Sequence, residues 1–340
     1  MGRVYLDYNA TAPLRPEARA AMEAAMDVVG NPSSVHYEGR AAKRLVERAR
    51  AQVAAGVGCQ PQEVVFTSGA TEAASVLADW QGAVEVEPTA HDAVFAHKRD
   101  SDGPGIYAMG VANSETGVLS EPPVGGEQAL LLDITQALGR VPFAFSWSGA
   151  DLAVCSAHKL GGPKGVGALI VKQGVDIPAL SLGGGQEMGR RSGTENIIGI
   201  AGFGAAVEAA MHDLESGVWA HVEQLRNILE TILVDLGAGP IFVGTDGARL
   251  PNTSCIIAPG WKGETQVMSM DLAGFAISAG SACSSGKVKA SRVLAAMGYD
   301  EDQAASAIRV SLCPDTTEEM ITRFAENWAR QYDKHRARAA

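Results

Sequence analysis

A lysine in a glycine-rich turn is the residue whose setting most favours covalent chemistry. Lys159 follows the apolar run at 153–155 and lies within the segment Ser156 to Gly162. A lysine that leaves a buried strand can be desolvated, which lowers its pKa and makes its amine a nucleophile toward aldehydes. On residue type alone, a surface lysine in a loop is an equally good interpretation.

Two other segments have the pattern of an anion site. In Thr67 to Glu72 a strand pattern ends, a glycine turns the chain and a helix pattern begins. The free N–H groups of such a helix start, with the hydroxyl of Thr71, can bind a phosphate. Taken alone, an ordinary helix cap is the better explanation. Gly183 to Asn196 combines glycines, two arginines and Thr194 before another helix pattern, which again suits an anion.

An acid and an imidazole follow two further strand patterns. Asp133 ends the apolar run at 129–134, and Gln136 comes three residues later. Ligands of α/β proteins bind where strands end at one edge of the sheet, although a helix-capping Asp is the favoured reading of this residue alone. His91 follows the run at 84–86 and, by itself, is more typical of a structural or surface histidine.

The last candidate is a cysteine in a polar loop, Gly280 to Lys287. The run is not a phosphate-binding P-loop, because five residues separate its glycines and Val288 stands where the motif needs Ser or Thr. It instead places Cys283 among small polar residues, which is typical of a mobile, exposed thiol. An incidental loop cysteine is the alternative.

Alternating helix and strand patterns must position these residues. Short apolar runs of the kind found in strands buried on both faces of a mainly parallel sheet lie at 64–67, 106–112, 129–134, 153–157 and 166–171. After Gly237, strand patterns at 242–243, 253–258, 275–278 and 308–312 alternate with helix patterns. The last helix is expected at about 316–332. The sequence predicts an α/β protein with a large, mainly parallel sheet domain over 10–215 and a smaller α+β domain over 216–340 together with 1–9.

Composition excludes several classes of function. The chain has 28 Lys and Arg against 39 Asp and Glu, a net charge of −11, so no general attraction to nucleic acid or to an anionic membrane is expected. No uncharged apolar run reaches about 18 residues, and the first 20 residues do not resemble a signal peptide. The five scattered cysteines indicate a reducing, cytoplasmic location and predict neither a disulfide framework nor a metal site.

Together these segments resemble the cysteine desulfurases of the class V aminotransferase superfamily, which have fold type I and use pyridoxal 5'-phosphate (PLP). A phosphate cradle, an acid for a pyridine nitrogen, a Schiff-base lysine and an aromatic ring are the parts that such an enzyme requires. The resemblance spans nearly the whole chain, through the segments Tyr5–Thr11, Gly30–Ser34, Thr67–Glu72, Asp133–Gln136, Ser156–Lys159, Gly184–Asn196, Ser281–Ser285 and Ile308–Leu312.

The resemblance implies a role for each site residue. Lys159 forms the Schiff base with PLP, Asp133 pairs with the pyridine nitrogen, and Gln136 hydrogen-bonds the ring hydroxyl. His91 stacks on the ring, and Cys283 accepts the sulfur, its thiolate favoured by a nearby cation such as Lys287 or His91. The remaining residues divide by ligand: Ala70, Thr71, Ser156, His158 and, from the partner subunit, Thr194 for the phosphate; Asn113 and Ser114 for the cofactor; Arg309 and Asn31 for the substrate.

The sequence departs from the family pattern in two places. Ser114 stands where the family usually has a second asparagine, before Glu115-Thr116-Gly117, and offers a shorter side chain. The stretches 92–112 and 118–132 are shorter than the family resemblance leads one to expect, so a peripheral helix or a whole βα excursion is missing there.

The resemblance implies an L-cysteine desulfurase that releases L-alanine and carries a persulfide for iron–sulfur cluster assembly or another sulfur-transfer pathway. The implied partners are L-cysteine, a sulfur-acceptor or iron–sulfur scaffold protein and a second copy of the chain in a homodimer, without nucleic acid or membrane. Two alternatives stay open: a related PLP enzyme, such as a selenocysteine lyase or a small-amino-acid aminotransferase, and a degenerate, non-catalytic partner of sulfur-assembly proteins.

Overall fold

The computed structural model describes residues 2–103, 105–123, 126, 128–237, 239–280 and 290–339. The chain forms two compact units: unit 1 contains Met1–Ala10, Asn113–Leu119 and Gly217–Ala340, and unit 2 contains Thr11–Ala112 and Ser120–Ser216. The segment Asn113–Leu119, expected within the large domain, thus belongs to unit 1. Backbone hydrogen bonds from Leu119 N to Ala248 O and from Leu250 N to Gly117 O hold it there.

Unit 2 is built on a six-stranded mixed sheet. Its strands lie in the order β2 (Val64–Thr67), β7 (Gly167–Val171), β6 (Leu152–Ser156), β5 (Ala129–Asp133), β4 (Ile106–Gly110) and β3 (Val84–Val86). β3 to β6 pair in parallel, whereas β7 is antiparallel to both of its neighbours. Every residue of β2, β6 and β7 is buried, as expected for strands covered on both faces.

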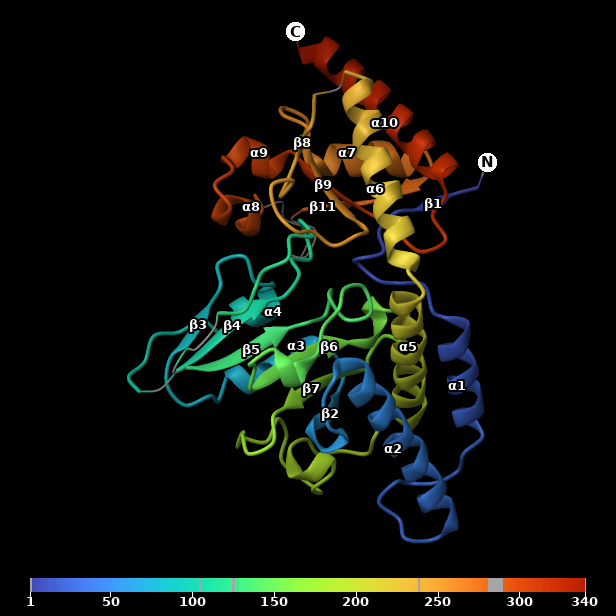
Figure 1. Ribbon diagram of the computed structural model, residues 1–340, viewed down its shortest axis with the longest axis vertical. Coiled ribbons are helices and arrows are strands. Elements are labelled where there is room, and N and C mark those ends of the chain that lie inside the picture. The colour runs from blue at the N-terminus through green and yellow to red at the C-terminus, as the bar shows by residue number, and fades with distance from the viewer. Residues whose placement is uncertain are drawn as a thin grey trace. The chain divides into compact units, whose positions relative to one another are not determined.

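Successive residues of each strand enter two different cores. Leu130 and Leu132 pack in one hydrophobic cluster with residues of α2 (Tyr37–Val57) and α5 (Ile197–Glu215), whereas Leu131 packs in another with residues of α3 (Ala70–Ala74). This alternation is the period of two of a β-strand. α1 (Pro16–Met26), α2 and α5 gather side by side in unit 2 (Figure 1).

Two connections of the parallel sheet are short. Between β3 and β4 the structure has only the four-residue helix α4 (Asp92–Phe95), and between β4 and β5 the described residues form no helix. The crossover between parallel strands usually contains a longer helix than this. These two connections overlap the stretches 92–112 and 118–132 that the sequence marks as short.

Helix α5 is long and apolar enough to cross a membrane by length and composition, which is weak evidence because the core helix of a soluble protein passes the same test. In the structure α5 packs along both α1 and α2. Its Phe203 is fully buried and meets the ring of Phe66 edge-on, with ring centroids 6.3 Å apart. The packing of α5 inside unit 2 accounts for its apolar sequence.

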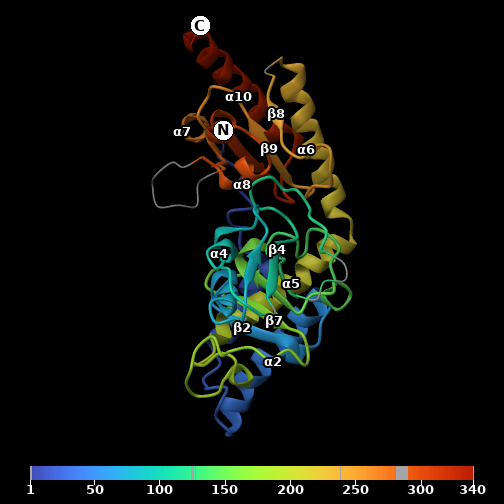
Figure 2. The ribbon, with the colours of Figure 1, turned by 90° about the vertical axis from the view of Figure 1, so that its left-hand side faces the viewer.

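Unit 1 has an antiparallel sheet covered by helices. The sheet has the order β11 (Ser278–Ala279), β12 (Ala307–Ser311), β9 (Thr253–Ile257) and β8 (Ile241–Phe242), and β1 (Val4–Tyr5) pairs separately with β10 (Phe275–Ala276). Its helices are α6 (Val218–Asp235), α7 (Gly263–Leu272), α8 (Arg292–Ala296), α9 (Glu301–Ala305) and α10 (Glu318–Ala339). α6 packs against α10 and β9 (Figure 2). The smaller part is therefore α+β, as expected.

Candidate active site

The predicted phosphate residues meet where β2 and β6 end. Thr67 and Ser156 both stand opposite Gly167 of β7, so the ends of β2 and β6 lie at the same edge of the sheet. A Cβ atom at Gly167 would come within 2.6 Å of the Cα of Gly69, so only glycine lets the turn before α3 lie this close. A Cβ at Gly69 would in turn lie 3.7 Å from Ser156 Oγ.

The first turn of α3 fits a phosphate. Gly69 begins the helix, whose first hydrogen bond runs from Ala73 N to Gly69 O, so the N–H groups of Ala70 and Thr71 lie in the first turn, where a helix leaves its donors to other partners. The hydroxyls of Thr71 and of the adjacent Ser156 add further donors. The residues present therefore fit the phosphate of PLP at this helix start.

Glu72 makes one half of the capping box that its spacing from Ser68 suggests. The backbone N–H of Ser68 donates to Glu72 Oε2 at 2.6 Å, and Arg191 Nε donates to Glu72 Oε1 at 2.9 Å. Burial opposes ionisation of Glu72, but the hydrogen bonds from Arg191 and Ser68 outweigh it, so the pKa of this carboxyl is lowered. Glu72 links the phosphate turn to the glycine-rich segment at 183–196.

Asp133 and Gln136 occupy the end of β5, next to β6. Asp133 is half-buried, pairs in register with Val154, and accepts a hydrogen bond from Thr135 N at 2.9 Å. Gln136 is 4% exposed, and its Oε1 accepts a hydrogen bond from Arg140 Nη1 at 2.6 Å. The hydroxyl of Thr135 is buried without a hydrogen-bond partner. An acid, an amide and an orphaned hydroxyl therefore meet at this edge, a donor set that suits a polar ring.

Lys159 ends the 3₁₀ turn η4 (Ala157–Lys159), directly after β6. It is half-buried, and its carbonyl accepts a hydrogen bond from Arg140 Nη2 at 2.7 Å. The neighbouring His158 bonds through Nδ1 to Thr11 Oγ1 at 3.2 Å. Burial, and then the charges of Lys159 and Lys164, lower the pKa of His158 to about 4, so its imidazole is neutral at neutral pH.

The remaining candidate residues of unit 2, His91, Asn31 and Thr194, are exposed. His91 is exposed and caps α4 by accepting a hydrogen bond from Ala93 N at 3.1 Å through Nδ1, which leaves the N–H of its ring on Nε2. Asn31 is exposed and forms a turn by accepting from Ser33 N at 2.9 Å. Thr194 is exposed in the glycine-rich segment. The contacts described for His91, Asn31 and Thr194 join none of them to another candidate residue, so their roles stay predictions.

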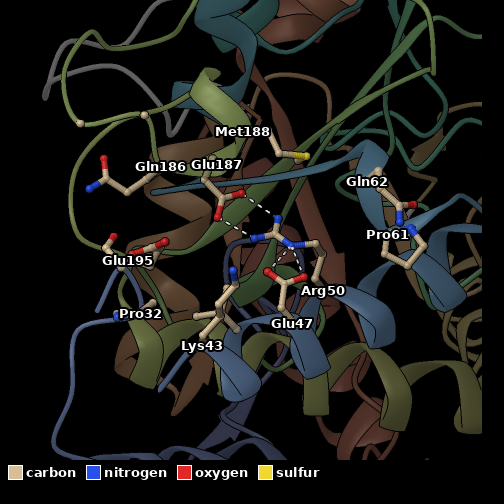
Figure 3. A pocket seen from close by; sticks show the side chains of 14 residues that line it. Pro32, Lys43, Glu47, Arg50, Pro61, Gln62, Gln186, Glu187, Met188 and Glu195 are labelled. Carbon is tan, nitrogen blue, oxygen red and sulfur yellow. Dashed lines mark hydrogen bonds and ion pairs between the residues drawn. The ribbon is translucent and has the colours of Figure 1, made fainter. Parts of the chain in front are cut away.

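A buried ion pair anchors the segment that carries Thr194. Arg50 of α2 donates through Nη1 and Nη2 to the two carboxylate oxygens of Glu187, at 2.8 Å each, and their side chains are 7% and 2% exposed. Figure 3 shows Arg50 lying between Glu187 and Glu47 in a pocket of about 310 Å³. Burial opposes the charge of Arg50, but Glu187 outweighs it and raises the pKa of the guanidinium.

Replacing Arg50 with methionine is expected to lower the free energy of unfolding by about 3–5 kcal/mol, because Glu187 would remain buried without its cation. Glu187 and Met188 have positive φ angles of 48° and 58°, conformations that persist only where surrounding contacts impose them. Chemical denaturation of the cofactor-free protein measures the change. The control is Lys172→Met, which breaks an ion pair whose lysine is 51% exposed and should cost less than about 1 kcal/mol. Equal losses in the two variants would contradict the anchoring role.

In unit 1, Arg309 is held by an acid and a carbonyl. The buried Arg309 of β12 donates through Nη2 to Asp7 Oδ1 at 2.7 Å and through Nη1 to the carbonyl of Ser114 at 2.9 Å. Ser278 Oγ also donates to Asp7 Oδ1, at 2.9 Å. The Nε of Arg309 is buried without a hydrogen-bond partner. The guanidinium therefore keeps a donor available for a carboxylate.

Ser114 contacts Arg309 through its backbone, so the replacement of the usual asparagine does not remove this contact. Asn113 accepts hydrogen bonds from the N–H groups of Glu115 and Thr116, each at 2.9 Å, which fixes the turn that presents the Ser114 carbonyl. Both residues thus have a structural contact besides the cofactor role that the sequence predicts for them.

Cys283 lies outside the described residues. Of the other cysteines, Cys155 and Cys255 are fully buried, and desolvation raises the pKa of each thiol to about 12. Burial also raises the pKa of Cys59 to about 12. Cys313 is half-buried, with its Sγ 3.4 Å from Thr316 Oγ1. Three of the four described thiols are therefore poor nucleophiles.

Two residues that contact candidate residues, one in each unit, were missed by sequence reasoning. Arg140 joins Gln136 to the backbone of Lys159, and Asp7 holds Arg309. The spacing of four between Gln136 and Arg140 was a usable signal, and Asp7 lies inside the motif Tyr5–Thr11. Neither pattern reveals that the side chain is engaged in the protein interior.

Comparison with known proteins gives the family. The family model "Aminotransferase class-V" matches residues 4–93 and 102–324. The chain is 38% identical to a cysteine desulfurase of Frankia sp. (strain EuIK1), over 96% of this chain and 90% of that protein, and 37% identical to one of Cereibacter sphaeroides, over 96% and 95%. A NifS-like protein from Rickettsia africae ESF-5 superposes with a TM-score of 0.88 at 30% identity, covering 97% of this chain and 99% of that one.

The same comparisons bear on the connections before and after β4 and on the fold. The alignment with the Frankia protein spans 381 positions, more than the 340 residues of this chain, so that protein contains segments that this chain lacks. The expected fold, fold type I of the PLP-dependent transferases, and the expected cofactor, PLP, are confirmed. The chain belongs to the class-V aminotransferase family.

Proposed function

We infer that this protein is a PLP-dependent L-cysteine desulfurase, which converts L-cysteine to L-alanine and takes up the sulfur. The observation that carries this inference is the similarity to cysteine desulfurases along nearly the whole chain, at 34–38% identity. Retention of Lys159, Asp133 and Gln136 at one edge of the sheet argues against a degenerate, non-catalytic protein.

When bound, PLP supplies an aldehyde that condenses with amines and a ring that withdraws electrons from the substrate Cα. Lys159 would hold the cofactor covalently, and its amine would take the proton from the substrate Cα. Asp133 keeps a proton on the pyridine nitrogen through its negative charge. The Ala70 and Thr71 amides with Ser156 bind the phosphate, and Arg309 binds the substrate carboxylate with its unused donors.

Cys283 completes the reaction as the sulfur acceptor. Its thiolate attacks the sulfur of the substrate and forms an S–S bond. The C–S bond of the substrate breaks with its electron pair on carbon, and that carbon then takes up a proton. The products are L-alanine and a persulfide on Cys283, so no external oxidant or reductant is needed for the transfer itself.

We further propose that the persulfide is passed to an acceptor or scaffold protein in iron–sulfur cluster assembly or another sulfur-transfer pathway, in the cytoplasm. The sequence Ser281-Ala282-Cys283 and the scattered cysteines, which are typical of a reducing compartment, support this proposal. Incubation with L-cysteine and dithiothreitol tests the activity: alanine and sulfide should appear in equal amounts. Alanine without sulfide, or neither product, would contradict the desulfurase assignment, and selenide release confined to selenocysteine would favour a selenocysteine lyase.

The functional unit is proposed to be a homodimer, because the resemblance assigns Thr194 to the partner's phosphate and closed twofold symmetry is the commonest assembly. Exposed apolar side chains in unit 2 support this, since Val29, Val35 and Tyr37 are 80%, 86% and 67% exposed. Light scattering should give twice the mass of the chain, and Thr194→Ala should weaken cofactor binding at an unchanged mass. A monomer that retains PLP at working concentration would contradict the prediction.

A further inference from the structure

A buried arginine joins two residues of the proposed cofactor site. Arg140 lies seven residues after the end of β5 and is 2% exposed. Its guanidinium donates through Nη1 to Gln136 Oε1 at 2.6 Å and through Nη2 to the Lys159 carbonyl at 2.7 Å. Both are short, charge-assisted hydrogen bonds, donated by the two terminal nitrogens of one planar guanidinium. Arg140 thus couples the turn after β5 to the turn after β6.

The contact with Arg140 decides which way the Gln136 amide points. A guanidinium has only donors, so the amide atom that faces it must be the oxygen. The N–H₂ group of Gln136 then stands on the other side of the amide. With its oxygen engaged by Arg140, the group that Gln136 offers to the ring hydroxyl is its N–H₂ donor.

We propose that Arg140 is a positioning residue that orients Gln136 as a donor and fixes the backbone of Lys159, and that it thereby sets the protonation of the Lys159–cofactor linkage. The inference rests on the proposed roles of Gln136 and Lys159. A donor to the ring hydroxyl oxygen draws negative charge off that oxygen. The positive charge of Arg140 also disfavours a second positive charge nearby. Both effects lower the pH at which the linking nitrogen loses its proton.

The visible absorption of the bound cofactor is expected to change with pH as the linking nitrogen loses its proton. The midpoint of this titration is compared between the wild-type protein and the variants. In Arg140→Met, the midpoint of this titration should move upward by about one pH unit, because both effects are lost. In Arg140→Lys the charge remains but the fork is lost, so a smaller upward shift is expected. The other titratable groups near this edge are unchanged in both variants: Asp133 on β5, His158 in η4 and Lys164 after it.

A matched control separates positioning from general destabilisation. Arg226 of α6 is also buried, at 5% exposure, and donates through Nη1 to the Leu250 carbonyl at 2.8 Å. Arg226→Met should lower thermal stability, as the Arg140 variants should, but leave the midpoint at the wild-type value. The midpoint is measured by spectrophotometry and does not depend on turnover.

Two results would overturn the inference. One is an Arg140 variant that binds cofactor and titrates at the same midpoint as the wild-type protein. The other is a shift of the midpoint in Arg226→Met as large as that in Arg140→Met. If Arg140→Met cannot be purified, the midpoint of Arg140→Lys decides the question. Failure of the proposed site itself has a different signature, because Lys159→Ala would then still bind the cofactor covalently.

Discussion

Replacement of Lys159 by alanine is expected to abolish the covalent attachment of PLP. The wild-type protein, treated with borohydride, should retain a cofactor adduct on the peptide that contains Lys159, and the variant should retain none. The physical reason is that an amine must condense with the cofactor aldehyde, and Lys159 ends the turn after β6, beside the phosphate residue Ser156. Turnover should fall at least about a thousandfold, since the same amine moves the Cα proton.

The matched control is Lys164→Ala. Lys164 stands in the same glycine-rich turn, carries the same group and is exposed. Its removal should leave both the adduct and the turnover near the wild-type values. An adduct that persists in Lys159→Ala, and maps to another lysine, would show that the cofactor site has been assigned wrongly.

Replacement of Cys283 by serine is expected to abolish sulfide release while cofactor binding persists. Serine cannot form the persulfide, but it does not alter the residues proposed to hold PLP. The protein should therefore still turn yellow with cofactor and respond spectroscopically to L-cysteine. The loss in sulfide release, measured with dithiothreitol, should be at least about a thousandfold, because nucleophilic transfer is the step removed.

The other cysteines provide the controls for this prediction. Cys155→Ala and Cys255→Ala remove fully buried thiols whose pKa is raised to about 12, so at neutral pH almost none of either thiol is ionised. These two variants should keep sulfide release, apart from any cost in stability. If Cys283→Ser released sulfide as fast as the wild-type protein, the alternative functions of a selenocysteine lyase or an aminotransferase would be favoured.

The strand ends of unit 2 could be predicted from the sequence because their signal is local. Asp133 and Lys159 each follow a short apolar run, and residues of that kind at strand ends meet at one edge of the sheet. The short connections before and after β4 were likewise visible as chain length alone. The roles carried over from the family, such as those of His91 and Asn31, remain predictions.

Contacts between distant parts of the chain could not be predicted. Arg50 and Glu187 are 137 residues apart, and no sequence pattern around either residue predicts a buried ion pair. The segment Asn113–Leu119 joins unit 1 through pairing with residues near Ala248, whereas its sequence neighbours on both sides belong to unit 2. Pairing of this kind depends on tertiary packing rather than on local propensity.

A local pattern can also be realised only in part. Ser68 and Glu72 have nearly the spacing of a capping box, in which the serine side chain caps the helix. In the structure Gly69 is the N-cap of α3, without a side-chain cap, and the Glu72 carboxylate accepts from the Ser68 backbone, as in a capping box, and also from Arg191. The ion pair with Arg191, 119 residues away, holds this arrangement.

The central claim is that the protein removes sulfur from L-cysteine onto Cys283. Mass spectrometry of the wild-type protein, digested after brief exposure to L-cysteine without reductant, tests this most directly. The peptide containing Cys283 is expected to gain the mass of one sulfur atom and to lose it again on treatment with dithiothreitol. The peptides of Cys59, Cys155, Cys255 and Cys313 should gain no such mass. Alanine formed with no added sulfur on the Cys283 peptide, or sulfur found on another cysteine, would contradict it.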